Sequence, residues 1–485
     1  MLTAPVALIR RMENQAVISG IAEYDLMLRA GIRAADYIRE FFPYARRFVI
    51  LCGGGNNGGD ALVAARYLLP HKVVIFSTKD KASFTGCAAN AVRDLPETIP
   101  FFVRSTLSDA DFFPGDVIVD GLLGIGFSGG VLKANVQNFI SAVNRSNLPV
   151  VALDLPSGID ADSGNAADNG AVKADVTLTF GRPKSGLFQS DGSLLRGAVR
   201  LLDIGLSGDS PDGIAVYTNI EAVAAVPRFA VDCHKNSRGR ILIWGSSPEY
   251  PGAAALSAVA ALKAGAGIVR CVSEADLSNR LCNAVIFEKL IPGNYPDKFM
   301  KSSDVLVCGC GWGSCANVES LHRALEFPGK VVLDADALNI AAGEPSSWIC
   351  RENLIITPHP GEAARLMQAF GIPSSGNRQS DALNLAERLN ATVVLKGHDS
   401  VVAFPGGKPL LVAAGSPMLA TAGSGDVLAG VIGALAGKME AVEAAALGAY
   451  IHGVAGENLR SIPIADELPQ LISEVIIKLQ RNQLI

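Results

Sequence analysis

The sequence predicts an α/β protein in which parallel sheets are covered by helices on both faces. One observation is a repeated plan of short β-branched apolar runs, each followed by a glycine-rich or acidic turn and then an alanine- and leucine-rich helical pattern. Apolar strands that alternate with helices are typical of parallel sheets buried between helical layers. The second observation is the length of 485 residues, which leaves room for two or three domains, each with its own core.

The expected strands fall into two groups separated by a linker. In the first group they are residues 47–52, 72–76, 116–119 and 150–153. Residues 205–213 interrupt the plan, because Gly, Ser, Asp and Pro follow one another there without apolar periodicity. We therefore predict two unlike domains, 1–213 and 214–485. In the second domain the expected strands are 240–244, 304–307, 330–333, 353–356 and 392–395.

Two apolar segments complete the second domain. Residues 253–272 are interrupted by Lys263 and Arg270, so they predict a buried helix and a strand rather than a membrane span. Residues 468–479 have helical spacing and predict a closing helix.

Composition excludes several classes of protein. Hydrophobic residues make up 49% and charged residues 18%, which excludes disorder over most of the chain. The net charge is −5 and no run of basic residues is longer than a pair, so the sequence offers no basic patch that would bind nucleic acid. Nine cysteines without a repeated CxxC pair predict reduced thiols in the cytoplasm. The first apolar stretch comes before Arg10 and Arg11, whereas in a signal peptide the positive residues come first. We expect a cytoplasmic protein with no nucleic-acid or membrane partner.

A glycine-rich turn at residues 53–60 follows the first expected strand and leads into a helical pattern. Its five glycines let backbone amides approach a ligand at the start of the helix, which predicts an anion site. The turn also satisfies GxGxxG, so a Rossmann dinucleotide site is an alternative. Asp60 argues against that alternative, because its charge would repel a pyrophosphate but suits sugar hydroxyls. A plain tight turn with Asp60 as a helix-start charge is the other alternative.

Two further acidic turns, beginning at Asp120 and Asp154, follow strands of the same domain. Carboxylates at the carboxyl ends of adjacent parallel strands converge on the crevice where such sheets bind ligands. Asn57, Asp120 and Ser157 together offer the oxygen ligands that a non-redox cation prefers. The alternative is that each aspartate only caps the segment that follows it.

These motifs resemble the NAD(P)H-hydrate epimerases. The resemblance rests on GGGNNGGD, DGLLGIG, ALDLPSGID and GAVKADVTLTFGRPKSGL, and on MENQAV and DLMLRAG near the start. It implies a Rossmann-like three-layer domain that interconverts the R and S epimers of hydrated nicotinamide cofactor, NADHX and NADPHX. It also implies a potassium ion on Asn57, Asp120 and Ser157. The implied hydrate-binding residues are Asn56, Asn57, Gly58, Gly59, Asp60, Gly124, Ile125, Gly126, Phe127, Ser128, Gly129, Gly130 and Asp154.

Epimerisation at this carbon needs a proton shuttle, whether it proceeds by ring opening or by loss and re-addition of water. We expect Asp154 to be the acid and base. Lys184 is a candidate helper, because the family places a basic residue in that KSG turn.

The second domain carries a longer glycine motif, AGSGDVLAG at residues 422–430. A glycine turn that opens an apolar helix forms an anion hole for a phosphoryl group, and Asp426 can take a proton from an attacking hydroxyl. The chain has no Walker lysine in this motif, which excludes an ordinary P-loop ATPase. The motif therefore predicts phosphoryl transfer of another kind.

Three other turns after expected strands agree with phosphoryl transfer: KGHDS at 396–400, TPHPGE at 357–362 and GCGWG at 309–313. His359 lies between two prolines in a rigid turn, which favours a ligand contact over a core histidine. Asp334 and Asp336 are candidates either for Mg²⁺ or substrate binding or for a helix-start role. The histidines without such a setting are His71, His234, His322 and His452.

These turns resemble the ADP/ATP-dependent NAD(P)H-hydrate dehydratases, which have a ribokinase-like fold. The resemblance implies that the hydroxyl of the S hydrate is phosphorylated and phosphate is then eliminated, which restores NADH or NADPH. ADP is the usual phosphoryl donor in bacterial members of this fused arrangement, although the residues themselves do not decide between ADP and ATP. Mg²⁺ is also expected. The implied hydrate-binding residues are Ala253, Gly311, His359 and Asp426. The implied nucleotide-binding residues are Lys396, Gly397, His398, Asp399, Ser400 and Gly425.

The order of the two resemblances matches the bifunctional NAD(P)H-hydrate repair enzymes, and we expect a homo-oligomer. One alternative is a ribokinase-like vitamin-precursor kinase with an accessory nucleotide-binding domain. The other is a non-catalytic first domain beside an active second domain.

Overall fold

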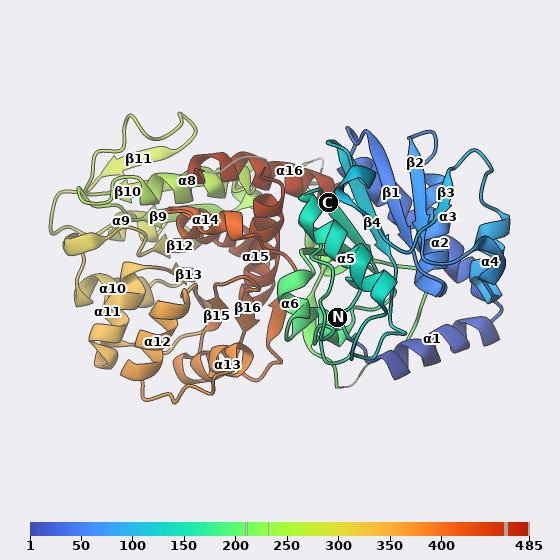
Figure 1. The fold of residues 1–485 in the computed structure, drawn as a ribbon. Helices are drawn as coiled ribbons and strands as arrows, with labels where there is room; N and C mark the ends of the chain where they lie inside the picture. Colours follow the sequence, from blue (N-terminus) through green and yellow to red (C-terminus); the bar gives the residue numbers. More distant parts are fainter. Residues whose placement is uncertain (209, 211, 231, 460–463, 484–485) are drawn as a thin grey trace. The chain divides into compact units, whose positions relative to one another are not determined.

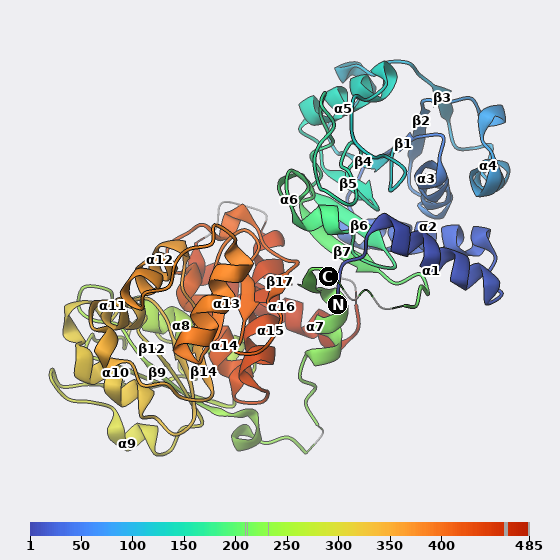
Figure 2. The same ribbon diagram turned by 90° about the horizontal axis from the view of Figure 1, so that it is seen from below.

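The computed structural model describes residues 1–483 except 209, 211, 231 and 460–463. Its contacts divide the chain into two compact units, Met1–Ile214 and Ala215–Gln483. Residues 209 and 211 of the expected linker lie outside the described part. Figures 1 and 2 show that each unit is a sheet with helices packed against it.

The first unit is built on a seven-stranded parallel sheet with the order β3-β2-β1-β4-β5-β6-β7. Strand β1 lies between β2 and β4, so the chain turns in opposite directions after β1 and after β4. This switch point opens a crevice beyond the carboxyl ends of these strands, where ligands of open α/β sheets bind. The strands are β1 Arg47–Cys52, β2 Val73–Ser77, β3 Phe101–Val103, β4 Asp116–Gly121, β5 Val150–Leu153, β6 Val176–Phe180 and β7 Ala198–Leu202.

Alternate residues of β1 pack on opposite faces of this sheet. Phe48 and Ile50 belong to a core shared with helices α2, α3 and α4, whereas Val49 and Leu51 belong to a core shared with α5. The unit therefore has three layers, as the sequence predicts. Its helices are α1 Val6–Ile18, α2 Glu23–Phe41, α3 Asn56–Tyr67, α4 Gly86–Arg93, α5 Ala134–Ser146 and α6 Gly192–Leu195.

The second unit contains a ten-stranded sheet with the order β11-β10-β9-β12-β13-β14-β15-β16-β17-β8. Among the described strands of this sheet, the pairs β15–β16 and β16–β17 are antiparallel and the others are parallel. Strand β9 lies between β10 and β12, so this sheet also has a switch point. The strands are β8 Ala215–Tyr217, β9 Arg240–Trp244, β10 Ile268–Ser273, β11 Ile286–Lys289, β12 Val305–Cys308, β13 Lys330–Leu333, β14 Leu354–Ile356, β15 Thr392–Leu395, β16 Val401–Ala403 and β17 Leu410–Val412.

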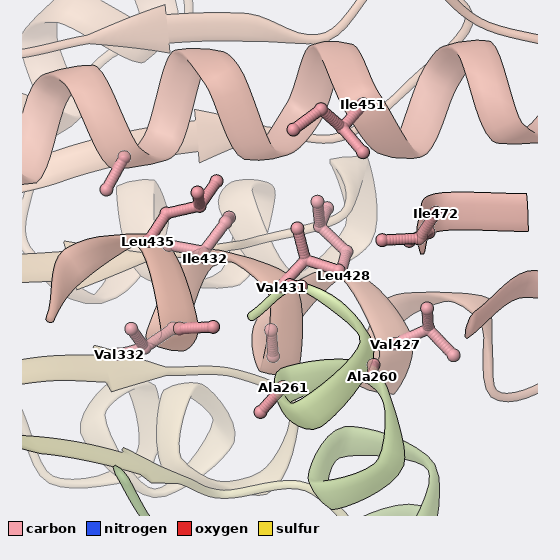
Figure 3. Packing of buried hydrophobic residues seen from close by; sticks show 14 of the residues in the cluster. Ala260, Ala261, Val332, Val427, Leu428, Val431, Ile432, Leu435, Ile451 and Ile472 are labelled. Carbon is pink, nitrogen blue, oxygen red and sulfur yellow. The ribbon is translucent and has the colours of Figure 1, made fainter. Parts of the chain in front are cut away.

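Helices cover both faces of this sheet as well. One core includes α8, α14, α15 and α16, and the other includes α10, α11, α12 and α13. Figure 3 shows helix α14 between Ile451 of α15 and Ala261 of α8, so α14 is held on two sides. The helices are α7 Asn219–Ala225, α8 Ala253–Lys263, α9 Asp297–Met300, α10 Val318–Leu325, α11 Asp336–Gly343, α12 Pro360–Ala369, α13 Arg378–Leu389, α14 Ser424–Ala436, α15 Ala441–Glu457 and α16 Leu468–Gln480.

The two apolar segments singled out in the sequence behave as expected. Residues 253–272 form α8 and most of β10, and residues 468–479 lie within α16. In the part of the chain that the structure describes, no helix combines the length and the apolar character needed to cross a bilayer.

Candidate active sites

A cavity of about 680 Å³ opens at the switch point of the first unit. Helices α1 and α2, the glycine turn after β1, and the loops after β4, β5 and β6 form its walls. The expected residues that line it are Asn56, Asn57, Asp60, Gly124, Ile125, Gly126, Phe127 and Asp154. The strand order therefore brings the turns that begin at Asp120 and Asp154 to one crevice, as the sequence predicts.

Five expected hydrate-binding residues do not line this cavity. A Cβ on Gly58 would lie 2.0 Å from the Gly53 carbonyl oxygen, and one on Gly59 would lie 2.5 Å from Met27 Cε. These two glycines allow α3 to pack closely against its neighbours. Ser128, Gly129 and Gly130 are exposed farther along the loop after β4.

Asp60 lies just beyond the first turn of α3, which begins at Asn56, and it faces the cavity. Burial raises its pKa well above the usual value, and the nearby charges of Asp154 and Glu13 raise it further. The helix-start role is therefore wrong for Asp60, because its carboxyl lies beyond the first turn of the helix and faces the cavity. Burial also raises the pKa of Glu13. Sequence reasoning did not single out Glu13 or Lys79, although both line the cavity and Glu13 lies within MENQAV.

Asp154 is held in a strained and tightly bonded position at the end of β5. Its φ of 66° is uncommon for a residue with a side chain, and such strain persists where the surroundings enforce it, often at active sites. Its carboxylate pairs with the Lys184 ammonium and accepts the Phe180 N–H at 3.3 Å. Lys184 is 1% exposed and also donates to the Phe180 carbonyl at 2.8 Å. The structure thus places the candidate helper in contact with the candidate acid and base.

The three residues expected to bind a cation are linked by hydrogen bonds at the edge of this cavity, which Asn57 lines. Ser157 donates its hydroxyl to Asp120 at 2.6 Å, and its backbone N–H donates to the same carboxyl at 2.8 Å. Asn57 donates its amide to the Leu123 carbonyl at 2.8 Å. Its own oxygen, Oδ1, is buried without a hydrogen-bond partner. Burial raises the pKa of Asp120 to about 6, although the bonds from Ser157 lower it. Asn57 and Ser157 both hydrogen-bond Leu123, and an unpaired buried oxygen in such a cluster is an arrangement that a bound cation would satisfy.

A second cavity, of about 650 Å³, opens at the start of α14 in the second unit. Gly423 begins the helix with a φ of 87°, and a Cβ on Gly425 would lie 3.3 Å from Lys396 Nζ. Backbone amides at this helix start can therefore approach a ligand closely, next to a lysine. The expected residues that line the cavity are His359, Lys396, Gly397, His398, Ser400, Gly425 and Asp426.

Asp426 lies at the centre of a polar cluster in this cavity. Its carboxylate, the Asp334 carboxylate and the Cys310 sulfur each offer an atom within 4.8 Å of the others. Burial and then the charge of Asp334 raise the pKa of Asp426 to about 6. Asp334 itself accepts the Lys396 ammonium at 2.7 Å and the Thr357 hydroxyl at 2.8 Å. A carboxylate with such a pKa is ionised at neutral pH and can still take up a proton, as a general base requires.

His359 lines this cavity and also caps helix α12. Its Nδ1 accepts the Gly361 N–H at 3.0 Å, so a proton on the neutral ring is carried by Nε2. Burial lowers its pKa, and Lys396 lowers it further. Asp336 has the helix-start position in the first turn of α11 and accepts the Gly313 N–H at 2.8 Å, whereas Asp334 faces the cavity.

Three expected residues of the second site lie outside the cavity lining. A Cβ on Gly311 would lie 2.8 Å from Ala253 Cβ, so these two residues pack against each other beside Cys310. Asp399 is buried within the turn of residues 396–400. His452, by contrast, lines the cavity although its sequence surroundings gave no sign of it, because α15 is apolar on all sides.

Comparisons with known proteins cover both units. Residues 241–478 match the family model described as NAD(P)H-hydrate dehydratase, and residues 23–186 match the one described as YjeF-related protein N-terminus. The bifunctional NAD(P)H-hydrate repair enzyme Nnr of Coxiella burnetii is 35% identical over 466 residues, which are 93% of each chain. Its Escherichia coli K12 counterpart is 33% identical over 481 residues, 93% of this chain and 88% of that one.

A comparison of structures agrees with this fold. A ribokinase-like superfamily protein from Enterococcus faecalis V583 matches 56% of this chain and 99% of its own, with a TM-score of 0.51 and 22% identity. The second unit therefore has a ribokinase-like fold, and the first is Rossmann-like. With near full-length relatives above 30% identity and both domain models in the same order, this chain belongs to the family of bifunctional NAD(P)H-hydrate repair enzymes.

Proposed function

We propose that this enzyme repairs hydrated nicotinamide cofactors in two steps, one in each domain. The domain of residues 1–213 epimerises the R and S forms of NADHX and NADPHX. The domain of residues 214–485 converts the S form to NADH or NADPH at the expense of a nucleotide. Joining the two activities has a chemical reason, because an S-specific dehydratase alone would leave the R form unrepaired.

The observation that carries the dehydratase assignment is the position of Asp426. It lies in the first turn of α14, faces the cavity and is close to the amides of the glycine turn. In the proposed reaction Asp426 takes the proton of the substrate hydroxyl, whose oxygen attacks the terminal phosphorus of the nucleotide. The helix start stabilises the charge of the transferring group. The nucleotide leaves with one phosphate fewer. Phosphate then departs from the substrate with the electrons of its C–O bond, the neighbouring ring carbon releases a proton to solvent, and the ring double bond of the reduced cofactor is restored.

The nucleotide would be held by the turn of residues 396–400 and by Gly425. All residues of this turn except Asp399 line the same cavity as Gly425, which supports the assignment. ADP is the expected donor. Mg²⁺ would neutralise charge on the phosphates, and the carboxylates of Asp334 and Asp426 are oxygen donors of the kind it prefers. Ala253 and Gly311 remain candidates for contacts with the hydrate beside Cys310.

In the epimerase site Asp154 would exchange the proton, with Lys184 holding it in place and balancing its charge. Potassium would be bound by Asn57, Asp120 and Ser157, and the unpaired Asn57 oxygen supports this assignment. The ion would fix the loops after β4 and β5, which carry Leu123 and Ser157. Asn56, Asp60 and the loop of residues 124–127 would contact the hydrate.

One coupled assay tests both activities. Mixed or pure R epimers are incubated with ADP or ATP, with and without potassium, while the absorbance of the reduced nicotinamide is followed. Full conversion of the R form, faster than spontaneous epimerisation allows, requires both sites. A lone dehydratase with a non-catalytic first domain would consume only the S form.

The vitamin-precursor kinase would instead leave a stable phosphorylated product and no reduced cofactor, and the family matches favour repair over this alternative. We also propose that the enzyme is cytoplasmic, because its nine cysteines are free thiols, and that it is a homo-oligomer. Light scattering coupled to size-exclusion chromatography tests the second proposal.

A further inference from the structure

His452 lies behind the glycine turn of the second site, on helix α15. It is 7% exposed, and its ring nitrogen Nε2 lies 3.0 Å from the backbone carbonyl oxygen of Ser424 and 3.1 Å from the Ser424 hydroxyl. Ser424 is the first residue of α14, two positions before Asp426, and both His452 and Ser424 line the cavity. A buried histidine therefore contacts the start of the phosphate-facing helix from the side of the neighbouring helix.

The contact with the carbonyl decides which ring nitrogen carries the proton. A carbonyl oxygen only accepts hydrogen bonds, so at 3.0 Å the Nε2 atom must be the donor. Burial lowers the pKa of His452 to about 4, which keeps the ring neutral, with Nε2 as its protonated nitrogen. Because Nε2–H is a donor, it cannot accept the proton of the Ser424 hydroxyl.

The Ser424 hydroxyl proton is therefore left for another acceptor. Among the described residues, His452 is the only hydrogen-bond partner of the Ser424 hydroxyl, and this partner donates. The remaining open direction is the cavity that Ser424 lines. A hydroxyl in the first turn of a helix, with its proton directed to a ligand, adds a side-chain donor to the backbone amides that meet a phosphoryl group.

We propose that His452 is a positioning residue for phosphoryl transfer, holding the Ser424 hydroxyl so that it donates to a phosphoryl oxygen of the nucleotide. This role rests on the proposed function, because it requires a nucleotide phosphate in this cavity. His452 acts through Ser424, so its contribution disappears when the hydroxyl is absent.

The test is a double-mutant cycle in the full-length enzyme with ADP as the varied substrate. His452→Phe keeps a ring of similar size without a donor, His452→Gln offers an N–H at a similar reach, and Ser424→Ala removes the hydroxyl. We expect His452→Phe to lower kcat/KM for ADP about tenfold, as is typical when one charge-assisted hydrogen bond is lost. If that bond strengthens in the transition state, most of the change should appear in kcat. His452→Gln should recover a large part of this loss.

The coupling between the two positions separates this role from a structural one. In the Ser424→Ala background, His452→Phe should change kcat/KM less than twofold, because the hydroxyl it would misplace is gone. Equal losses in both backgrounds, or unchanged ADP kinetics in a folded His452→Phe protein, would overturn the proposal. If His452→Phe does not fold, His452→Leu, which also lacks an N–H donor, replaces it in both backgrounds and decides the same question.

Two controls complete the design. His322→Phe makes the same exchange on α10, outside the cavity lining, and should leave ADP kinetics unchanged. Epimerisation by the first domain reports that each variant is folded and correctly quantified. Failure of the proposed function itself would look different, since the wild-type enzyme would then show no nucleotide-dependent formation of reduced cofactor.

Discussion

Replacing Asp426 by Asn tests the proposed base of the dehydratase reaction. The exchange keeps the shape of the side chain but removes its ability to take the hydroxyl proton. Loss of a positioned general base costs roughly 10²- to 10⁴-fold in rate. We therefore expect kcat for the S hydrate with ADP to fall by a factor in this range, while epimerisation by the first domain is unchanged.

The raised pKa of Asp426 gives the same prediction a pH dependence. With a pKa of about 6 in the free enzyme, the base is ionised in roughly 97% of molecules at pH 7.5 and in roughly 10% at pH 5. The wild-type kcat/KM should therefore rise with pH and level off above pH 7. The residual activity of the Asn variant should lack this inflection near pH 6.

The variant should also be more stable at neutral pH, which distinguishes lost chemistry from lost structure. The shift from 3.8 to about 6 means that folding disfavours the charged carboxylate, and this cost is present above pH 6 and absent below the unfolded value. A shift of that size corresponds to roughly 3 kcal/mol. Thermal unfolding of the second domain should thus occur at a higher temperature in the Asn variant at pH 7.5.

The assay follows the absorbance of reduced nicotinamide from pure S hydrate, with Asp276→Asn as a control on an exposed loop. A folded Asp426→Asn enzyme that repairs the hydrate at the wild-type rate would refute the role of this carboxylate, and so would a wild-type pH profile that is flat from pH 5 to 8.

Three further predictions concern other parts of the chain. Asp154→Asn should lower the rate of epimerisation of the R form by about 10²-fold or more. Lys184→Met should do the same, because it leaves the buried carboxylate without its cation. Dehydration of pure S hydrate by the same proteins is the control, and a wild-type rate of epimerisation in either variant would remove that residue from the mechanism. Asn57→Leu should abolish stimulation of epimerisation by potassium, measured as a titration of rate against KCl with NaCl holding ionic strength constant, and an unchanged potassium response would remove Asn57 from the ion site. Gly430→Ala should destabilise the second domain by about 1–3 kcal/mol or more in denaturant unfolding, because its Cβ would lie 2.1 Å from the Ser257 carbonyl oxygen. Gly343→Ala, with open space around its Cβ, is the control and should have little effect. Equal stability of the two variants would contradict the close packing of α14 on α8.

Most chemical groups of the two sites were visible in the sequence because they follow a buried strand, whereas Asp426 was marked by its glycine motif. The runs before Asp120 and before residues 357–362 and 396–400 are apolar on both faces, and only the turn at their ends is polar. Parallel strands place all such turns at one edge of a sheet, so the sequence pattern itself predicts that these residues meet.

Other features depended on contacts between distant segments. Glu13 and Lys79 line the first cavity because α1 and the loop after β2 contribute to its wall, and although Glu13 lies in the MENQAV motif, nothing local assigns either side chain to the site. Gly58 and Gly59 pack against the Gly53 carbonyl and Met27, and sequence alone cannot distinguish a glycine that meets a ligand from one that meets a neighbouring segment.

The sequence by itself determined the α/β class, the two-domain plan and the turns that carry Asp154 and Asp426, since these follow from strand patterns and local backbone chemistry. Only the tertiary structure decided which side chains pair. The contact of Lys184 with Asp154 spans 30 residues, and that of His452 with Ser424 spans 28. Such pairs depend on how helices and loops pack, because the sequence around each residue does not specify which distant side chain it will contact.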